Sequence, residues 1–282
     1  MLALSKLLGR LASESACLVT LEESRGSVPR EKGAWMAVFG VGEAGTIGGG
    51  HLEYSAMAEA RQRLSRGGSE ALVRYALGPS LGQCCGGEVH LRFQLVTAAD
   101  IEALRLRLAT ALQPVALFGG GHVGRALVEV LTRLPLAVSW IDSRDEIFPA
   151  NVPANVICQH SDPVQGAVAS LASGSYVLIM SFSHAEDLDV LASCLLRQRE
   201  RADLPYIGLI GSGTKWATFS HRLVARGFSA TELAQVTCPI GIAGISSKEP
   251  EVIALAVAAQ LMQTMEREQS QPHFAGACHA ER

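Results

Sequence analysis

The fold of this chain is decided by the segment Val115-Ala116-Leu117-Phe118-Gly119-Gly120-Gly121-His122-Val123-Gly124. Its first four apolar residues predict a short buried strand, and the six that follow match the G-x-G-x-x-G turn. Helical spacing then continues through residue 134. In a Rossmann unit, this turn joins the first strand to a helix whose N-terminus holds a pyrophosphate.

The next predicted strand, over 137–141, ends at Asp142, eighteen residues after Gly124. A Rossmann unit places an acid at this point to bind a ribose hydroxyl. Arg144 follows two residues later, where it could contact a phosphate or simply lie in solvent. The expected nucleotide- or phosphate-binding residues of this unit are Gly119, Gly120, Gly121, His122, Val123, Gly124, Asp142 and Arg144.

The alternation of predicted strands and helices continues along the chain. Strands are predicted over 155–158, 175–180 and 206–210, with helical segments after Asp162, after His184 and from Trp216, and a last helix over 251–265. Alternation of strand and helix requires parallel strands with right-handed crossovers. Ligands bind beyond the carboxyl ends of such strands, which adds Ser181, His184, Gly211 and Lys215 to the candidates.

Two of these candidates have competing interpretations. His184 could act as an acid or base, or it could be a surface histidine beside a helix-capping Ser183. The loop 211–215 resembles part of a phosphate cradle, but it lacks the full spacing of a P-loop.

The first part of the chain lacks this regular alternation of strand and helix. Strands are predicted over 16–22, 35–39, 71–76 and 89–96, with helical spacing over 54–66 and 100–111. The run Gly45-Thr46-Ile47-Gly48-Gly49-Gly50-His51-Leu52-Glu53 leads into the first of these helices. It could form an anion-binding N-terminus, or its glycines could serve ordinary tight turns.

The run Gln83-Cys84-Cys85-Gly86-Gly87 places two adjacent thiols between an amide and two glycines. A disulfide between neighbouring cysteines is strained, so two free thiols are expected. Each thiol could be a small buried hydrophobe, or the pair could bind a soft metal.

These patterns predict an α/β protein with two domains. A smaller N-terminal α+β domain is expected over 1–112, and a Rossmann-like doubly wound parallel sheet over 113–267, after a division near Gln113-Pro114. Residues 268–282 are polar and aperiodic and are expected to form a flexible tail.

The composition of the chain bears on which partners and which cellular compartment are expected. A formal net charge of −3 over 282 residues provides no broad basic surface, so nucleic acid and anionic membranes are unexpected partners. The first sixteen residues have an amphipathic helical pattern rather than that of a signal peptide, and no segment is long and apolar enough to span a bilayer. Seven scattered cysteines favour a reducing cytoplasm.

Taken together, the motifs resemble the XdhC/CoxI family, in family order and over nearly the whole chain. The resemblance rests on the glycine run 45–53, the Gln83–Gly87 run, the loop 118–124 with Asp142 and Arg144, and the segments 206–215 and 239–251. The segment 244–248 is looser than the family pattern, and Gly213 and Trp216 stand where basic residues are more common. These departures weaken a phosphate-binding role for the loop 211–215.

The resemblance implies a chaperone rather than an enzyme. Members of this family are thought to hold molybdenum cofactor while a cysteine desulfurase adds its terminal sulfido ligand, and then to deliver it to xanthine dehydrogenase. The implied binding residues are Gln83, Cys84, Cys85, Gly86, Gly87, Gly49, Gly50 and Glu53, with Cys84 or Cys85 as a soft ligand to molybdenum. A homodimer is expected.

Two other functions stay open. The Rossmann loop could serve an NAD(P)-dependent oxidoreductase, although no Tyr-x-x-x-Lys pair or zinc-ligand set completes such a site. The paired cysteines could instead relay sulfur as a persulfide, which would require an activated thiolate. The Rossmann site itself could hold the cofactor, a nicotinamide or another nucleotide.

Overall fold

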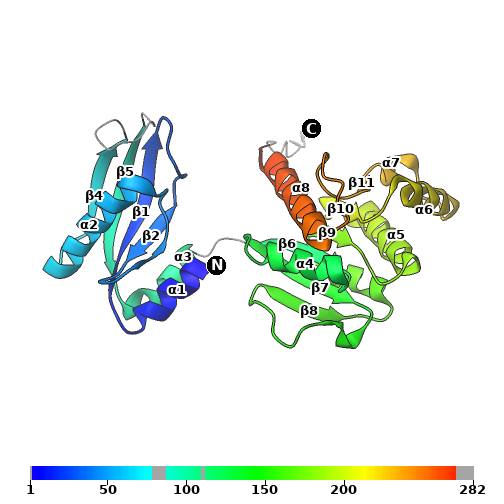
Figure 1. Ribbon diagram of the computed structural model, residues 1–282, viewed down its shortest axis with the longest axis horizontal. Coiled ribbons are helices and arrows are strands. Elements are labelled where there is room, and N and C mark those ends of the chain that lie inside the picture. Colours follow the sequence, from blue (N-terminus) through cyan, green and yellow to red (C-terminus); the bar gives the residue numbers. More distant parts are fainter. Residues whose placement is uncertain (1, 78–86, 109–111, 271–282) are drawn as a thin grey trace, which may run out of the picture. The chain divides into compact units, whose positions relative to one another are not determined.

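The computed structural model describes residues 2–77, 87–108 and 112–270 of the chain. The chain divides into two compact units, Met1–Thr110 and Ala111–Arg282. Each unit has its own sheet and its own helices (Figure 1).

The first unit is built on an antiparallel sheet of five strands in the order β3-β2-β1-β5-β4. Its strands are β1 (Ala16–Arg25), β2 (Trp35–Val38), β3 (Glu43–Gly45), β4 (Ala71–Ala76) and β5 (Glu88–Val96). Along β4, half-buried and exposed residues alternate, as expected for an edge strand with one face toward solvent.

Helices cover both faces of this sheet. Its three α-helices are α1 (Leu2–Leu11), α2 (Gly50–Arg66) and α3 (Ile101–Leu108), and the 3₁₀ helix η2 (Ala98–Asp100) precedes the last of them. Leu52, Ala56 and Ala60 of α2 pack with Leu91 and Phe93 on one side. Leu7, Leu11 and Leu104, from α1 and α3, belong to a separate apolar cluster with Leu18 and Phe39.

The second unit contains a parallel sheet of six strands in the order β11-β10-β9-β6-β7-β8. Its strands are β6 (Gln113–Phe118), β7 (Leu136–Asp142), β8 (Val156–His160), β9 (Tyr176–Ile179), β10 (Tyr206–Leu209) and β11 (Val236–Thr237). The chain runs outward from β6 to β8, then returns to β9 and runs outward the other way. This reversal beside β6 is the topological switch point of a doubly wound fold, where ligands bind.

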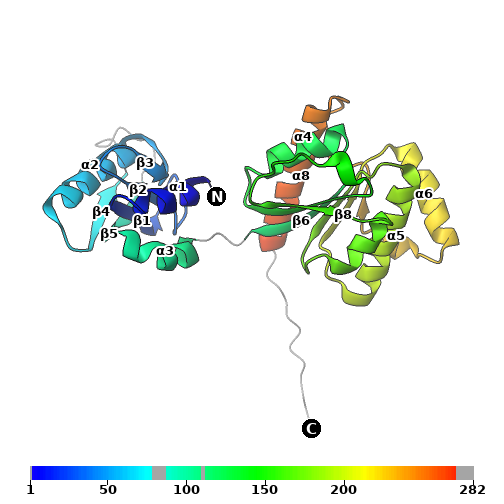
Figure 2. The ribbon, with the colours of Figure 1, turned by 90° about the horizontal axis from the view of Figure 1, so that it is seen from below.

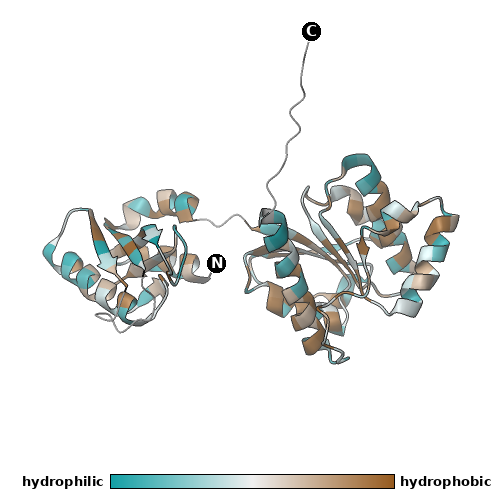
Figure 3. Ribbon diagram, turned by 90° about the horizontal axis from the view of Figure 1, so that it is seen from above, coloured by the Kyte–Doolittle hydropathy of each residue, from teal (hydrophilic) through white to brown (hydrophobic). Residues whose placement is uncertain are grey.

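Helices lie on the two faces of this sheet, as expected for a doubly wound fold (Figure 2). The helices are α4 (His122–Leu131), α5 (His184–Arg201), α6 (Gly213–Ala225), α7 (Ala230–Leu233) and α8 (Pro250–Ser270), with 3₁₀ helices η3 (Asp145–Ile147) and η4 (Val164–Ser170). Side chains of α4 and α8 form one apolar cluster, while those of η4, α5 and α6 form the other. All four residues of β9 and of β10 are buried, and the hydrophobic colouring of the strands is visible in Figure 3.

The predicted fold class is confirmed, with an antiparallel N-terminal unit and a parallel, doubly wound second unit. Several boundaries were wrong. Helix α4 ends at Leu131 rather than at 134, and α6 begins at Gly213 rather than at Trp216, with Ser212 as its cap. The helical segment predicted after Asp162 is confirmed and is the 3₁₀ helix η4. The short elements β3, α7 and β11 were not predicted.

The flexible tail expected from residue 268 is wrong for residues 268–270, and residues 271–282 lie outside the described residues. Helix α8 continues to Ser270, and the Glu268 carboxylate accepts a hydrogen bond from the Tyr176 hydroxyl, which ties that turn of the helix to the sheet.

Candidate functional site

The loop between β6 and α4 has the glycine geometry of a nucleotide-binding turn. Gly119 has a φ of 127°, and a Cβ there would lie 2.0 Å from the Met180 carbonyl oxygen. A Cβ at Gly124 would lie 2.1 Å from the Gly119 oxygen, so this glycine lets the helix pack closely. A Cβ at Gly121 would meet no atom within 4 Å. The first and third glycines of the motif therefore close the turn, while the second leaves space for a ligand.

The start of α4 is not capped by a side chain. Gly121 is the N-cap residue and makes no side-chain hydrogen bond, and His122, the first residue of the helix, is exposed. Val123 is half-buried and packs on the apolar cluster beneath. The first N–H groups of a helix lack partners within the helix and carry a partial positive charge, which suits a phosphate.

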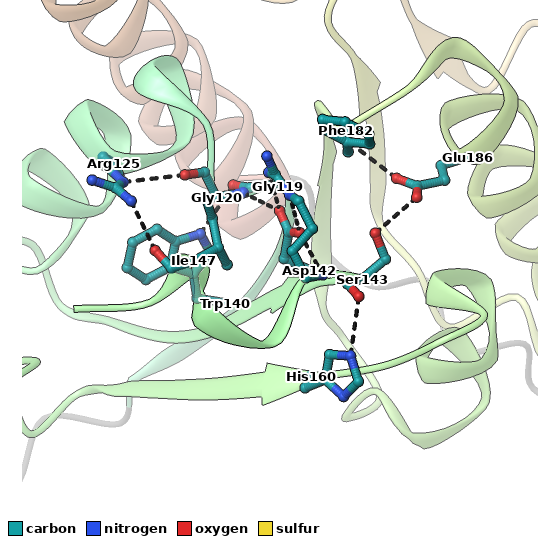
Figure 4. Close-up of polar contacts among 11 residues, drawn as sticks. Gly119, Gly120, Arg125, Trp140, Asp142, Ser143, Ile147, His160, Phe182 and Glu186 are labelled. Carbon is teal, nitrogen blue, oxygen red and sulfur yellow. Dashed lines mark hydrogen bonds and ion pairs between the residues drawn. The ribbon is translucent and has the colours of Figure 1, made fainter. Parts of the chain in front are cut away.

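Two residues that sequence reasoning missed support this loop (Figure 4). The Trp140 indole Nε1 donates to the Gly119 carbonyl at 3.0 Å from within the sheet. The Arg125 guanidinium donates to the carbonyl oxygens of Gly120 and Ile147 at 3.2 and 2.9 Å. Both contacts depend on the folded position of the loop, and neither leaves a pattern in the sequence.

Asp142 lies where the motif predicts it, at the end of β7, and it is buried with 1% of its surface exposed. Its Oδ2 accepts from the Gly120 N–H at 2.6 Å and from Arg144 Nη2 at 2.8 Å. Its Oδ1 accepts from the Arg144 N–H at 2.9 Å and from Arg144 Nε at 2.8 Å. Burial acts to raise the pKa of Asp142, but the hydrogen bonds from Arg144 and Gly120 outweigh it and hold the pKa below its ordinary value.

Arg144 links the end of β7 to the end of β9. Its guanidinium carbon lies 4.4 Å from the centre of the Phe182 ring, while 64% of Phe182 stays exposed. Beside this contact, the Ser143 hydroxyl donates to Glu186 at 2.8 Å, and the other oxygen of Glu186 accepts from the Phe182 N–H at 3.1 Å. The loops after β7 and β9 are thus joined directly at the switch point (Figure 4).

The candidates after β9 have different surroundings. The Ser181 N–H donates to Asp187 at 2.7 Å, whereas its hydroxyl oxygen is buried and has no hydrogen-bond partner among the described residues. Ser183 caps α5 by accepting from the Glu186 N–H, and His184 is exposed beside it. The structure therefore favours the capping interpretation of Ser183 and His184.

Lys215 is used inside the fold. Its ammonium donates to the buried Asp187 carboxylate at 2.6 Å and to the Ile210 carbonyl at 2.7 Å, and 10% of its side chain is exposed. A Cβ at Gly211 would lie 2.8 Å from the Lys215 side chain, so this glycine makes room for the lysine. This arrangement favours a structural role for Gly211 and Lys215 over the expected phosphate contact.

The glycine run of the first unit also forms an open helix start. Gly48, Gly49 and Gly50 all have positive φ angles, and Gly49 is the N-cap of α2 without a side-chain cap. Glu53 turns back on the loop, where its carboxylate accepts from the Thr46 hydroxyl and from the Ile47 N–H. Burial acts to raise the pKa of Glu53, but these hydrogen bonds prevail and lower it.

Three loops of the first unit meet at this place. A Cβ at Gly48 would lie 2.5 Å from Pro29 Cγ, and a Cβ at Gly87 would lie 2.4 Å from the Ser27 carbonyl oxygen. The turn that carries the exposed Arg25 and Arg30 therefore packs between the glycine run and the residue that ends the Gln83–Gly87 run. Gln83, Cys84, Cys85 and Gly86 lie outside the described residues.

The described residues form neither a metal-binding cluster nor a membrane-spanning helix. They contain no group of three or more His, Cys, Asp or Glu side chains placed to hold a metal ion. None of their helices has both the length and the apolar character needed to cross a membrane.

Each of the two units contains a segment that matches the model of a known protein family. A family model described as the XdhC Rossmann domain matches residues 115–261, and one described as the XdhC and CoxI family matches residues 10–76. An uncharacterized protein of Escherichia coli, YqeB, is 24% identical over 259 residues; the match covers 87% of this chain but 43% of that protein. The chain thus spans less than half the length of this relative.

The fold also matches a solved structure. A crystal structure described as a xanthine dehydrogenase from Bacillus halodurans superposes with a TM-score of 0.76 at 19% identity, over 95% of this chain and 98% of that one. At this level of identity, the match supports a common fold.

Proposed function

Because the chain belongs to the XdhC and CoxI family, we propose that it is an accessory protein that binds molybdenum cofactor and delivers it to xanthine dehydrogenase. The observation that carries this proposal is that family models match both units in chain order. Its cargo would be held during sulfuration by a cysteine desulfurase, in the cytoplasm, in support of purine catabolism. We propose that the chain itself catalyses no reaction and acts as a homodimer.

The convergence of loops in the first unit supports a cofactor site there. Gly49 and Gly50 begin α2 without a side-chain cap from the N-cap residue Gly49, and Arg25 and Arg30 are exposed on the neighbouring turn. Such groups suit the phosphate of a pterin cofactor. Gly87 packs against that turn, so we propose that Gln83, Gly86 and Gly87 hydrogen-bond around the cofactor.

The two neighbouring thiols would supply the metal contact. Thiolate is a soft ligand, and molybdenum in this cofactor is already bound by sulfur of a dithiolene. We propose Cys84 or Cys85 as the residue that faces the metal. Glu53 contributes indirectly in this account, because its carboxylate holds the loop from Thr46 to Gly48.

A second candidate function draws on the other unit. The doubly wound strand order and the open Gly121 position favour nucleotide binding, which an NAD(P)-dependent oxidoreductase would use. Oxidation of NAD(P)H with a carbonyl or heterocyclic substrate would support it. A sulfur relay through Cys84 and Cys85 would instead yield a protein persulfide after incubation with a desulfurase and cysteine.

Cofactor retention tests the proposed site. The protein is mixed anaerobically with molybdenum cofactor and separated by rapid gel filtration, and the molybdenum and pterin that co-elute are measured. Wild type should retain the cofactor stoichiometrically, and the double variant Cys84→Ala/Cys85→Ala should lose it. Cys158→Ala, a half-buried cysteine of the other unit, is the matched control and should retain it. Equal retention in all three would refute the thiol site.

A further inference from the structure

We infer that the loop after β6 binds a nucleotide whose ribose carries a phosphate, and that Arg144 sets this preference. This site belongs to the second unit and is independent of the proposed cofactor site in the first. Three features of the structure carry the inference: an open phosphate cradle, an acid whose acceptors are all in use, and an arginine held with one edge free.

The cradle has room and donors for a diphosphate. Gly121 is the one glycine of the motif whose Cβ would meet no atom within 4 Å, and it stands at the start of a helix of ten residues without a side-chain cap. The loop lies at the switch point between β6 and β9. Backbone N–H groups at such a helix start bind phosphate oxygens.

Ser181 adds an independent sign of a ligand. It directly follows Met180, whose carbonyl oxygen packs on Gly119. Its hydroxyl oxygen is buried and unpartnered within the described part of the chain. A buried polar group without a partner is costly, and a bound ligand is one way to satisfy it.

Asp142 has no acceptor to spare for a ribose diol. Each carboxylate oxygen already accepts two hydrogen bonds, three of the four from Arg144. A carboxylate offers about four lone-pair sites in all, so two ribose hydroxyls would have to displace Arg144. The loss of paired, charge-assisted hydrogen bonds would oppose binding of an unphosphorylated ribose.

Arg144 can instead receive an anion without moving. Nε and Nη2 hold Asp142, one face of the guanidinium lies on Phe182, and 34% of the side chain is exposed. Within the described residues, Nη1 donates no hydrogen bond. A guanidinium already fixed in position loses little freedom when its free edge binds a phosphate oxygen.

Calorimetric titration with NADP⁺ and NAD⁺ tests this preference, because these probes differ only in the phosphate on the ribose. Wild type should bind NADP⁺ about tenfold to a hundredfold more tightly, as expected for hydrogen bonds to a charged group. Arg144→Ala should lose that advantage and bind NAD⁺ at least as well as wild type does, because Asp142 is freed. Arg133→Ala, an exposed arginine near the far end of α4, should behave like wild type.

The outcomes that overturn the inference are distinct. Equal or tighter binding of NAD⁺ by wild type, no binding of either probe, or an unchanged NADP⁺ preference in Arg144→Ala would each do so. Arg144→Lys, which keeps the charge but loses the paired geometry, should fall between wild type and Arg144→Ala. Cys84→Ala/Cys85→Ala should keep the NADP⁺ preference, so failure of this site and failure of the proposed cofactor site can be told apart.

Discussion

The glycines of the β6–α4 loop differ in whether the fold has room for a side chain at their position. Gly119 combines a positive φ with a carbonyl oxygen 2.0 Å from the Cβ position, whereas Gly121 has an extended backbone and open space. Gly119→Ala should therefore destabilise the second unit by at least about 1–3 kcal/mol, the cost of such a backbone conformation alone.

Gly121→Ala should change the free energy of unfolding by less than about 0.5 kcal/mol, because the lower entropy of the unfolded chain offsets the weaker helix cap. Urea denaturation of both variants measures the contrast. The same Gly121→Ala protein should bind NADP⁺ more weakly, because the methyl group enters the space of the ligand. Equal stability losses at Gly119 and Gly121 would contradict the assignment.

Lys215 gives a second test at this scale. Its ammonium and the Asp187 carboxylate form a buried pair at 2.6 Å, with 10% and 4% of the side chains exposed. Lys215→Met would leave the Asp187 charge unpaired and should destabilise the protein by about 3–5 kcal/mol. Urea denaturation measures the loss, and NADP⁺ affinity of the folded variant should stay unchanged. A stable variant with weakened nucleotide binding would restore the phosphate-binding role.

Among the secondary-structure elements, α7 begins with a capping box whose carboxylate also pairs with an arginine of α5. Glu232 accepts from the Ser229 N–H at 2.8 Å in a capping box and from Arg199 of α5 at 2.6 Å. The hydrogen bond from Arg199 and those from Ser229 lower the pKa of Glu232 from 4.5 to about 2.

A lowered pKa in the folded state has a defined effect on stability. The ionised form of Glu232 stabilises the fold above pH 4.5, and this contribution is lost as the pH falls toward 2. Glu232→Gln should therefore be less stable than wild type at pH 6, and the difference should shrink as the pH falls through this window. Urea midpoints of both proteins from about pH 6 down to about pH 2 measure it, because this range includes the window between the ordinary pKa of 4.5 and the folded value of about 2. A difference that does not depend on pH would contradict the role of the charge.

The elements also show what the sequence could and could not predict. The apolar run before Gly119 and the acid at Asp142 specify β6, α4 and β7, because burial on both faces and tight glycine geometry leave clear patterns. The elements β3, α7 and β11 have too few residues to show periodicity, and they lack the continuous apolar run that marks the equally short strands β9 and β10.

Contacts between loops were beyond sequence reasoning for a different reason. The paired contact of Arg144 with Asp142, the support of Gly119 by Trp140, and the packing of Gly48 on Pro29 all depend on the folded positions of separate segments. The pairing of Lys215 with Asp187 likewise joins residues 28 positions apart. Local spacing carries no record of such contacts.

At the scale of the whole molecule, the two units have separate cores. Two apolar clusters contain residues of the second unit alone, and two others contain residues of the first unit alone. A domain with its own core can fold by itself. A fragment of residues 112–282 should therefore unfold cooperatively in urea and bind NADP⁺ as tightly as the full chain. An aggregated fragment without a cooperative transition would contradict this independence.

Delivery of the cofactor is the most direct test of the proposed function. The chain is loaded anaerobically with molybdenum cofactor, freed of unbound cofactor by gel filtration, and mixed with cofactor-free xanthine dehydrogenase, after which the two proteins are separated and assayed for molybdenum. Molybdenum is expected to move to the dehydrogenase, and xanthine oxidation is expected to appear after sulfuration. Molybdenum that never binds the chain, or that stays on it, would contradict the proposal.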